Sequence, residues 1–376
     1  MANPNRKLAT LRTIDTVTPI EGADRIECAH LGGWPVVIGK GEFAPGDCVI
    51  YFEVDSFLPT EDERFAFLAP RGTKKMLRDG EEVTGHVLRT AKLRGQYSQG
   101  LVMPIDAFPE VVDALALTRC GLGQLAEGHF DLTGVIGIWE YEKPIPPGAT
   151  HIIHPYDNSV APRTDAERAQ NVSQKVFDLV KRCDYFTSVK VDGTSITMCA
   201  ADDGSVRVFS HNYEVSTEEG IGATVVDVAT RGGLLGVACA HPNLTFQMEL
   251  CGPAIQSDRL RLGKPTLFVF SVWDRDRHEY VSPYGIEDLA RLGLTVPEFP
   301  LDLDDFATPT DLVEHVDGMR SNVTKDALDE GIVIHVTGPG EWPPADWPLV
   351  RADIESELGS QMQMKAISNR YLLKAK

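Results

Sequence analysis

Apolar residues in the first hundred positions fall into short runs that are separated by polar and turn-forming residues. Residues 34–38 and 48–54 form the clearest of these runs, and a Pro-Gly-Asp turn signal lies between them. Short strands at this close spacing are typical of a small closed barrel, and an OB-fold has the right size. The sequence therefore predicts a small OB-like β-barrel, followed by a helix within the largely apolar stretch at 108–127.

Beyond residue 160 the pattern changes, because runs typical of strands alternate with runs typical of helices. Thr164 begins this part with a helix-capping signal, since Glu167 stands three residues after it. We expect an α+β catalytic domain with mixed or antiparallel sheets and helices outside them. The expected strands include residues 206–210, 245–250, 267–274 and 330–336, and the expected helices lie near 222–231 and 285–292.

A proline-rich stretch separates these two parts of the chain. Proline blocks helices and interior strands, so residues 141–163 should form an extended, semi-rigid connector. We therefore divide the chain into an OB-like domain at 1–140, the connector at 141–163, and a catalytic domain at 164–376.

The net charge of the 376-residue chain is −19, which argues against a general binder of polyanions. A nucleic-acid enzyme of this charge has to concentrate its basic residues locally, because phosphate contacts supply much of the binding free energy. The clearest concentration lies at 71–94, which suggests that the OB-like domain binds nucleic acid; the alternative is a solvated loop. The candidates for phosphate contact are Lys74, Lys75, Arg78, Arg89, Lys92 and Arg94.

Export and membrane signals are not found in the sequence. No apolar run approaches the roughly 20 residues of a membrane-spanning helix, and the first residues do not resemble a signal peptide. The seven cysteines include no Cys-x-x-Cys pair, which excludes an obvious zinc ribbon and favours reduced thiols. We expect a cytoplasmic protein that is a monomer and does not contact a membrane.

The most informative chemistry begins at Lys190, which stands in a β-branched stretch two residues before Asp192 and Gly193. A strand that ends in a glycine turn holds the amine rigidly and leaves room beside the backbone for a bulky group. Such a lysine can act as a covalent nucleophile if its amine is neutral at the moment of attack. The motif Lys-x-Asp-Gly alone is weak evidence for a nucleophile, because an exposed hairpin could also contain it. Its value as evidence depends on the residues that follow.

Three further residues follow Lys190 in a characteristic order. Glu249 lies on an expected strand, Glu330 precedes an apolar strand, and Lys365 lies near the end of the chain. This order resembles motifs I, III, IV and V of the covalent nucleotidyltransferases, which include DNA ligases, RNA ligases and mRNA capping enzymes. The closing segment at 367–374 resembles the RNA ligase branch, specifically the template-directed ligases of the Deinococcus type.

The resemblance implies a role for each residue in the nucleotide site. Lys190 would attack the α-phosphorus of ATP and form lysyl-AMP. Glu249 would contact the sugar, Lys365 would hold the α-phosphate, and one aromatic ring, that of Phe268, would stack on adenine. Lys374 is a weaker candidate for the phosphate contact, since it could equally belong to a frayed end. The alternative for Glu249 is an outward-facing surface side chain.

Two further elements match the RNA ligases in part. Arg168 and Gln170 lie in an Arg-x-Gln-Asn element that resembles one ahead of motif I, with a solvated helix face as the alternative. Asn212 matches the element after motif I, but His211 stands where the family has arginine, which would weaken a phosphate or sugar contact. The chain also has Val189 where many relatives have glutamate, and His335 where arginine or lysine is common.

The carboxylates of this set require a metal ion. Asp192, Glu249 and Glu330 would raise the pKa of a nearby lysine, which is the wrong direction for a nucleophile. A divalent cation would offset them, and oxygen ligands with phosphate select Mg²⁺ or Mn²⁺. We expect Glu330 to be the metal-site residue, although a solvated glutamate at a strand edge is the alternative.

Together these observations predict an ATP-dependent RNA ligase. It would seal 3′-OH/5′-phosphate nicks in duplexes through lysyl-AMP and nucleic-acid-adenylate intermediates, with RNA on the 3′-OH side. Two alternatives stay open: a capping-type guanylyltransferase, which would use GTP, and a non-catalytic RNA-binding adaptor, which would never consume ATP.

Overall fold

The chain consists of two compact units, Met1–Pro147 and Gly148–Lys376. Their boundary falls within the expected connector at 141–163, of which residues 143–150 lie outside the part that the structure describes. The structure is a computed structural model, and the residues that it describes are 6–78, 81–118, 120–142, 151–201, 204–256, 258–321, 323–324 and 327–374.

The N-terminal unit is built from short antiparallel strands, as the apolar runs predict. Its strands are β1 (Ala9–Thr13), β2 (Thr16–Pro19), β3 (Ile26–Leu31), β4 (Trp34–Gly39), β5 (Cys48–Phe52), β6 (Ser56–Pro59), β7 (Lys74–Arg78), β8 (Glu81–Val87), β9 (Ala91–Leu93), β10 (Gln96–Ser98), β11 (Leu101–Pro104) and β12 (Trp139–Glu140). They pair in the orders β1-β5-β11, β2-β3-β4, β12-β6-β8-β7 and β10-β9. The two apolar runs that the sequence shows most clearly are β4 and β5.

The helices of this unit pack on the apolar side of the barrel strands. They are η1 (Glu63–Arg71), η2 (Ile105–Ala107), α1 (Pro109–Leu117), α2 (Leu122–Glu127) and α3 (Thr133–Ile136). Phe108, Val111 and Leu115 are buried in one cluster with Leu11 and Phe52 of the strands. The expected helix at 108–127 is therefore confirmed, but it is divided into α1 and α2.

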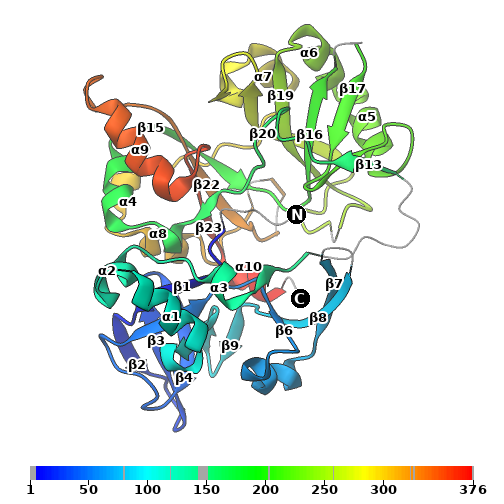
Figure 1. Cartoon of the computed structure of the whole chain (residues 1–376). Helices are drawn as coiled ribbons and strands as arrows, with labels where there is room; N and C mark the ends of the chain where they lie inside the picture. The colour runs from blue at the N-terminus through cyan, green and yellow to red at the C-terminus, as the bar shows by residue number, and fades with distance from the viewer. Residues whose placement is uncertain are drawn as a thin grey trace. The chain divides into compact units, whose positions relative to one another are not determined.

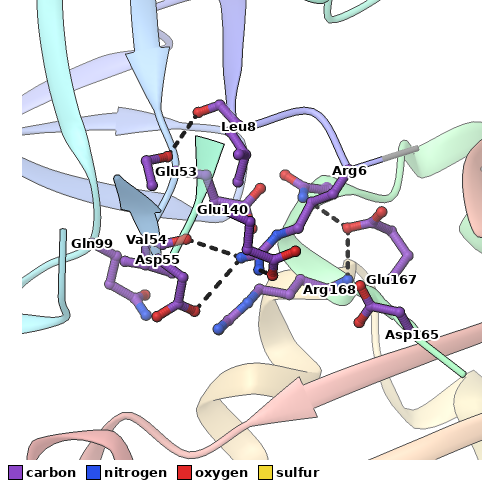
Figure 2. Close-up of polar contacts among 12 residues, drawn as sticks. Arg6, Leu8, Glu53, Val54, Asp55, Gln99, Glu140, Asp165, Glu167 and Arg168 are labelled. Atoms are coloured by element: carbon purple, nitrogen blue, oxygen red, sulfur yellow. Dashed lines mark hydrogen bonds and ion pairs between the residues drawn. The ribbon is translucent and has the colours of Figure 1, made fainter. Parts of the chain in front are cut away.

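Arg6 ties the start of the described chain to this unit (Figure 2). Its guanidinium donates to Glu53 and to the carbonyl of Val54, each at 2.9 Å, and it pairs with Glu140. Asp55, which has a positive φ of 73°, lies 3.6 Å from the same guanidinium. One arginine thus joins the connection between β5 and β6 to β12.

The C-terminal unit contains two sheets, which Figure 1 shows with helices beside them. Its strands are β13 (Ile152–Pro155), β14 (Glu167–Arg168), β15 (Asp184–Lys190), β16 (Thr194–Ala200), β17 (Val206–Phe209), β18 (Tyr213–Val215), β19 (Leu244–Cys251), β20 (Thr266–Asp274), β21 (Glu279–Val281), β22 (Gly331–Gly338) and β23 (Gln363–Ile367). The larger sheet has the order β13-β18-β17-β16-β19-β20-β21, and the smaller has the order β14-β23-β22-β15. The strands at 206–210, 245–250, 267–274 and 330–336 are all found close to their expected places.

Each sheet of this unit has its own hydrophobic core. The helices are η3 (Ala169–Asn171), α4 (Gln174–Lys181), α5 (Gly220–Gly232), α6 (Leu234–Ala240), η4 (Pro283–Gly285), α7 (Glu287–Leu292), η5 (Leu303–Asp305), α8 (Pro309–Val316), α9 (Trp347–Leu358) and α10 (Asn369–Lys374). Helices α5, α6 and α7 pack on the seven-stranded sheet, whereas α4, α8 and α9 pack on the four-stranded sheet (Figure 1). Lys190, Asp192 and Gly193, which the sequence singles out, lie where β15 of one sheet passes into β16 of the other.

The prediction that a helix begins at Thr164 is wrong. The first α-helix of the unit is α4, which follows the short 3-10 helix η3, and Ser173 caps α4 with its side chain. Glu167, the expected capping partner, accepts instead from the N–H of Arg168 and from the side-chain amide of Asn171, each at 2.8 Å. The carboxylate is therefore used to shape the short strand β14.

Among the described residues, no single helix has the length and apolarity needed to cross a membrane. Helices α5 and α6, which meet at a bend of 87°, reach that length and composition only when they are counted together.

Candidate active site

Lys190 and Glu330 are brought together by the pairing of two strands in the smaller sheet. β15 runs antiparallel to β22, and Lys190 faces Gly331 in the register. The side chain of Glu330 therefore lies beside Lys190, and the distance from Lys190 Nζ to Glu330 Oε1 is 2.8 Å. Gly331 is required here, because a Cβ atom would lie 2.0 Å from the carbonyl oxygen of Ala366. The glutamate is not a solvated strand end, since its side chain is only 13% exposed.

Glu249 reaches the same place from the larger sheet. It pairs with Ser195 across β16 and β19, and its Oε1 accepts a hydrogen bond of 3.0 Å from the N–H of Gly193. A side chain at Gly193 would place its Cβ 2.2 Å from the carbonyl oxygen of Leu250, so only glycine fits. Glu249 thus holds the turn that follows Lys190, and it does not point outward into solvent.

The electrostatics of this group are dominated by negative charge. Burial alone would lower the pKa of Lys190, but the charges of Glu330 and the other carboxylates outweigh it, so the pKa is raised. Burial raises the pKa of Glu249 to about 8, and Glu330 and Asp192 add to that effect. The amine in this form of the site is therefore protonated, and positive charge must be added before it can act as a nucleophile.

The carboxylates fit a hard divalent cation that keeps most of its water. The described residues contain no group of three or more His, Cys, Asp and Glu side chains arranged to hold a metal ion. Mg²⁺ is commonly bound through one or two carboxylates together with substrate phosphates and water. Glu330 offers such a carboxylate beside Lys190, whereas a closed protein cage is not required.

Lys365 lies on β23, next to β22 in the smaller sheet, where it pairs with Val333. Its Nζ is 2.8 Å from Oδ1 of Asp165, and the side chains are 17% and 25% exposed. β14 runs parallel to β23 and pairs Arg168 with Lys365. The ion pair with Asp165 was not anticipated from the sequence, because the two residues are 200 positions apart.

A cavity of about 220 Å³ connects these residues. Four of the residues that line it were predicted as site residues: Lys190, Glu249, His211 and Lys365. The others are Thr164, Asp165, Ala166, Ser188, Val189, Val191, Ser195, Phe270, Val296, Val333, His335 and Gln363.

Phe268 and Phe270 of β20 both pack against one small apolar cluster, and of the two only Phe270 lines the cavity. Phe268 is buried in a small apolar cluster with Val189 and Val296. Phe270, two residues farther along the strand, lines the cavity. The alternation of a strand puts both rings on one face, so the sequence could have offered either of them. The structure favours Phe270 as a ring that a base could contact.

Asp192 is held by two side chains that the sequence analysis did not single out. The phenol of Tyr371 in α10 donates a hydrogen bond to Asp192 Oδ2, and Nε of Arg259 lies 3.6 Å from the same oxygen. The guanidinium of Arg259 also lies 4.5 Å from the centre of the Tyr371 ring. Tyr371 lies within the closing segment that resembles RNA ligases, which is the only signal in the sequence that points to it.

The other residues predicted to contact the nucleotide are Arg168, Gln170, Asn212 and Lys374, and they lie outside the cavity. Arg168 and Gln170 are buried, which excludes a solvated helix face for them. Asn212 accepts a hydrogen bond of 3.1 Å from Arg163, and the backbone carbonyl of Lys374 lies 3.5 Å from Arg259. None of these four predicted residues lines the cavity as the structure describes it.

His335 occupies the position where relatives often have a cation. It is 4% exposed, stacks on the ring of Phe186 at 4.3 Å, and lies 3.0 Å from Ser188 Oγ through Nε2. Burial lowers its pKa to about 3. The imidazole is therefore neutral at physiological pH and does not replace the missing positive charge.

The basic residues of the N-terminal unit lie on or beside β7, β9 and β8, and several of them already have partners. Lys75 is 2.6 Å from Glu82, and Arg89 pairs with Asp55. Others lie over aromatic rings: Arg78 over Trp139, Arg89 over Tyr141 and Lys92 over Tyr97. The structure shows no ion pair for Lys74 or Arg94 within the described ranges.

Comparisons with known proteins identify both units. A family model described as RNA ligase matches residues 184–341, and one described as an OB-fold domain matches residues 8–105. No match was found among curated proteins.

Several solved structures of an RNA ligase from Naegleria gruberi are similar to the whole chain. A mutant with ATP and Mn is 31% identical, with 98% of this chain and 99% of that chain covered and a TM-score of 0.75. An apo mutant is 31% identical, with 100% and 99% covered and a TM-score of 0.76. The ligase with PPi is 32% identical, with 98% of both chains covered and a TM-score of 0.74.

These similarities confirm the predicted fold class, in which an OB-like domain precedes an α+β nucleotidyltransferase domain. The site agrees with them, since Lys190, Glu249 and Lys365 line one cavity and Glu330 contacts Lys190. The chain therefore belongs to the RNA ligase family of the covalent nucleotidyltransferase superfamily.

Proposed function

We propose that this ATP-dependent RNA ligase seals 3′-OH/5′-phosphate nicks in duplexes, with RNA on the 3′-OH side, through an AMP adduct on Lys190. The observation that carries the proposal is the contact of 2.8 Å between Lys190 Nζ and Glu330 Oε1 at the wall of a cavity that Lys365 also lines. The Naegleria ligase structures with ATP, AMP and Mn support the choice of nucleotide and of a divalent metal.

In the first step, the lone pair of Lys190 Nζ forms a bond to the α-phosphorus of ATP. The bond from that phosphorus to the bridging oxygen breaks, and pyrophosphate leaves. Before attack, Lys190 has to give up the proton that its contact with Glu330 stabilises. A divalent cation beside Glu330 would supply positive charge that offsets the carboxylates and the phosphates.

The remaining side chains position the nucleotide. Lys365 would contact the α-phosphate and would exchange its ion pair with Asp165 for that contact. Phe270 would stack on adenine, and Glu249 would contact the sugar with its second oxygen while the first accepts from Gly193. Holding reactants in line in this way accounts for much of the catalysis of phosphoryl transfer.

Two further steps complete the seal. The 5′-phosphate of the nick attacks the α-phosphorus of lysyl-AMP, which gives a nucleic-acid adenylate and frees Lys190. The 3′-OH then attacks the activated 5′-phosphorus, and AMP leaves. An RNA strand on the 3′-OH side would be distinguished from DNA by its 2′-OH and its A-form shape.

The substrate is tested with two nicked duplexes that differ only at the 3′-OH end. One has two ribonucleotides there and the other has only deoxynucleotides. We expect sealing of the first to be much faster, and equal sealing of both would contradict the RNA preference while leaving nucleotidyl transfer intact.

The alternatives are tested by the choice of nucleotide and by turnover. A capping-type guanylyltransferase would be labelled by α-labelled GTP, whereas we expect labelling by ATP. A non-catalytic adaptor would bind RNA without consuming ATP, and membership of the RNA ligase family argues against it. The seven cysteines are free thiols, which supports our further proposal of a cytoplasmic location. We also propose that the protein is a monomer.

We also propose that the OB-like unit engages the duplex through its basic residues. Replacing Lys74, Lys75 and Arg78 together by alanine should weaken nick binding and reduce the slope of log K against log salt by up to about 3, because each phosphate contact contributes about one unit. Binding is measured by fluorescence anisotropy at several salt concentrations.

The control for this triple variant is a change of equal charge elsewhere. Lys175, Arg231 and Arg291 are exposed cations on α4, α5 and α7, and their replacement by alanine should leave the salt slope unchanged. If the first triple variant binds and seals like the wild type, its three residues do not contact the substrate.

A further inference from the structure

Side chains from two segments that lie far away in the sequence contact the carboxylate of Asp192. Tyr371 is on the C-terminal helix α10 and is 5% exposed, and its hydroxyl donates to Asp192 Oδ2. Arg259 lies in the segment between β19 and β20, and its Nε is 3.6 Å from the same oxygen. The ring of Tyr371 and the guanidinium of Arg259 also contact each other. These three side chains form a closed cluster, which we call the Asp192 clasp.

The orientation of Asp192 matters because only one residue separates it from Lys190. The charge of the Asp192 carboxylate acts on the amine of Lys190. The hydrogen bond from Tyr371 fixes where that charge lies, and Arg259 places a positive charge beside it. A hydrogen bond to an ionised group is stronger than one between neutral groups, so it is well suited to hold the carboxylate.

The segment that carries Arg259 is itself tied to the turn after Lys190. The side-chain amide of Gln256 donates to the carbonyl of Gly193, and the hydroxyl of Thr324 donates to the carbonyl of Leu260. Left-handed backbone at non-glycine residues costs about 1 kcal/mol or more each and persists only where the surroundings enforce it. Within this segment the structure places four such residues: Ala254, Gln256, Asp258 and Arg261.

Tyr371 is positioned just as firmly from the other side. Its backbone N–H donates to Ser368 Oγ at 3.2 Å, and that hydroxyl donates to Asp317 at 3.1 Å. Asp317 also accepts a hydrogen bond of 2.7 Å from the backbone N–H of Arg370. The start of α10 is thus fixed, and the phenol reaches Asp192 from a rigid support.

We propose that Tyr371 is a positioning residue for the adenylylation of Lys190, acting through Asp192, and that Arg259 offsets the charge of that carboxylate. The inference rests on the proposed function, because it concerns the same reaction of Lys190 with ATP. It assigns the C-terminal helix a part in the first chemical step, which motif order alone does not give it.

The test is the variant Tyr371→Phe, which removes only the hydroxyl. The rate of lysyl-AMP formation at saturating ATP should fall about 10-fold or more, as expected for loss of a hydrogen bond to a charged group. The ATP concentration for half-maximal rate should change less than 2-fold, because Asp192 is being oriented and not replaced. A crystal structure of the variant should show the Asp192 carboxylate in a different rotamer.

The matched control is Tyr156→Phe. Tyr156 is 8% exposed, and its hydroxyl also makes a hydrogen bond inside the same unit, with Thr197 at 3.4 Å, but it does not line the cavity. Its adenylylation rate should stay within 2-fold of the wild type. For Arg259, the variant Arg259→Gln should lose more activity than Arg259→Lys, which keeps the charge.

Each result decides between defined outcomes. If Tyr371→Phe labels at the wild-type rate, or if it is slow while Asp192 has not moved, the positioning role is refuted. A slow Tyr371→Phe with a displaced Asp192 and a normal Tyr156→Phe supports it. Failure of the wild-type protein to be labelled would instead refute the proposed function, so the two failures are distinguishable.

Discussion

Replacing Lys190 by alanine is expected to abolish the transfer of AMP from ATP to the protein. Lysine adenylylation requires a nucleophilic amine close to the side chains of Glu330 and Glu249. Alanine lacks the nitrogen atom of Lys190 that would form the phosphoramidate bond to AMP. The protein is incubated with α-labelled ATP and Mg²⁺ or Mn²⁺ and then separated by denaturing electrophoresis. The wild type should retain label and Lys190→Ala should not.

The control for this experiment is Lys181→Ala. Lys181 lies at the end of α4, where its amine donates to the carbonyl of Phe306, and it does not line the cavity. Its replacement should leave labelling unchanged. Persistent labelling of Lys190→Ala would place the nucleophile elsewhere, and an unlabelled wild type would remove the basis of the nucleotidyl-transfer mechanism.

The second large effect is expected at Glu330. Glu330→Ala should slow lysyl-AMP formation by a factor on the order of 10² to 10³, because the variant loses the carboxylate that we propose holds a divalent cation beside the reacting phosphate. Glu330→Gln should be nearly as slow, since the amide keeps the shape but loses the charge. Single-turnover labelling across a range of Mn²⁺ concentrations measures both the rate and the metal requirement.

A glutamate outside the site provides the comparison. Glu355 on α9 forms a surface ion pair with Arg351 at 2.8 Å, and Glu355→Ala should label like the wild type. If Glu330→Gln kept wild-type labelling and metal dependence, the charge of this residue would have no role in the reaction, and the metal site would have to be sought elsewhere.

The sequence predicted those parts of the fold and site that are encoded locally. Apolar runs located β4, β5, β19, β20 and β22, because a buried strand is recognised by the apolar residues of the strand itself. The order of Lys190, Glu249 and Glu330 predicted a candidate catalytic group: Lys190 ends β15, Glu249 lies within β19, and Glu330 directly precedes β22. Strand pairing then brought them together as expected.

The errors and omissions come from contacts between distant parts of the chain. The capping signal at Thr164 failed because Ser173 makes the better cap, and that residue is held by Glu357, which lies 184 positions later. Asp165 and Tyr371 were missed for the same reason, since their partners Lys365 and Asp192 lie 200 and 179 positions away. No local pattern carries this information.

The choice between Phe268 and Phe270 could not be made from the sequence for a different reason. Both rings lie on one face of β20, and period-two alternation cannot rank them. Both rings pack against one apolar cluster that contains Val189 and Val296, and of the two only Phe270 lines the cavity. Which ring contacts the base therefore stays a prediction.

The passage of the chain from β15 to β16 has a mechanical consequence. Lys190 and Glu330 belong to the four-stranded sheet, whereas Glu249 belongs to the seven-stranded sheet, and only three residues of chain separate the two at this point. Any rocking of one sheet against the other would leave the lysine and Glu330 together as one rigid pair and would change their separation from Glu249. An AMP attached to Lys190 would then lie at the junction of the two sheets, where its contacts with both of them would resist this movement.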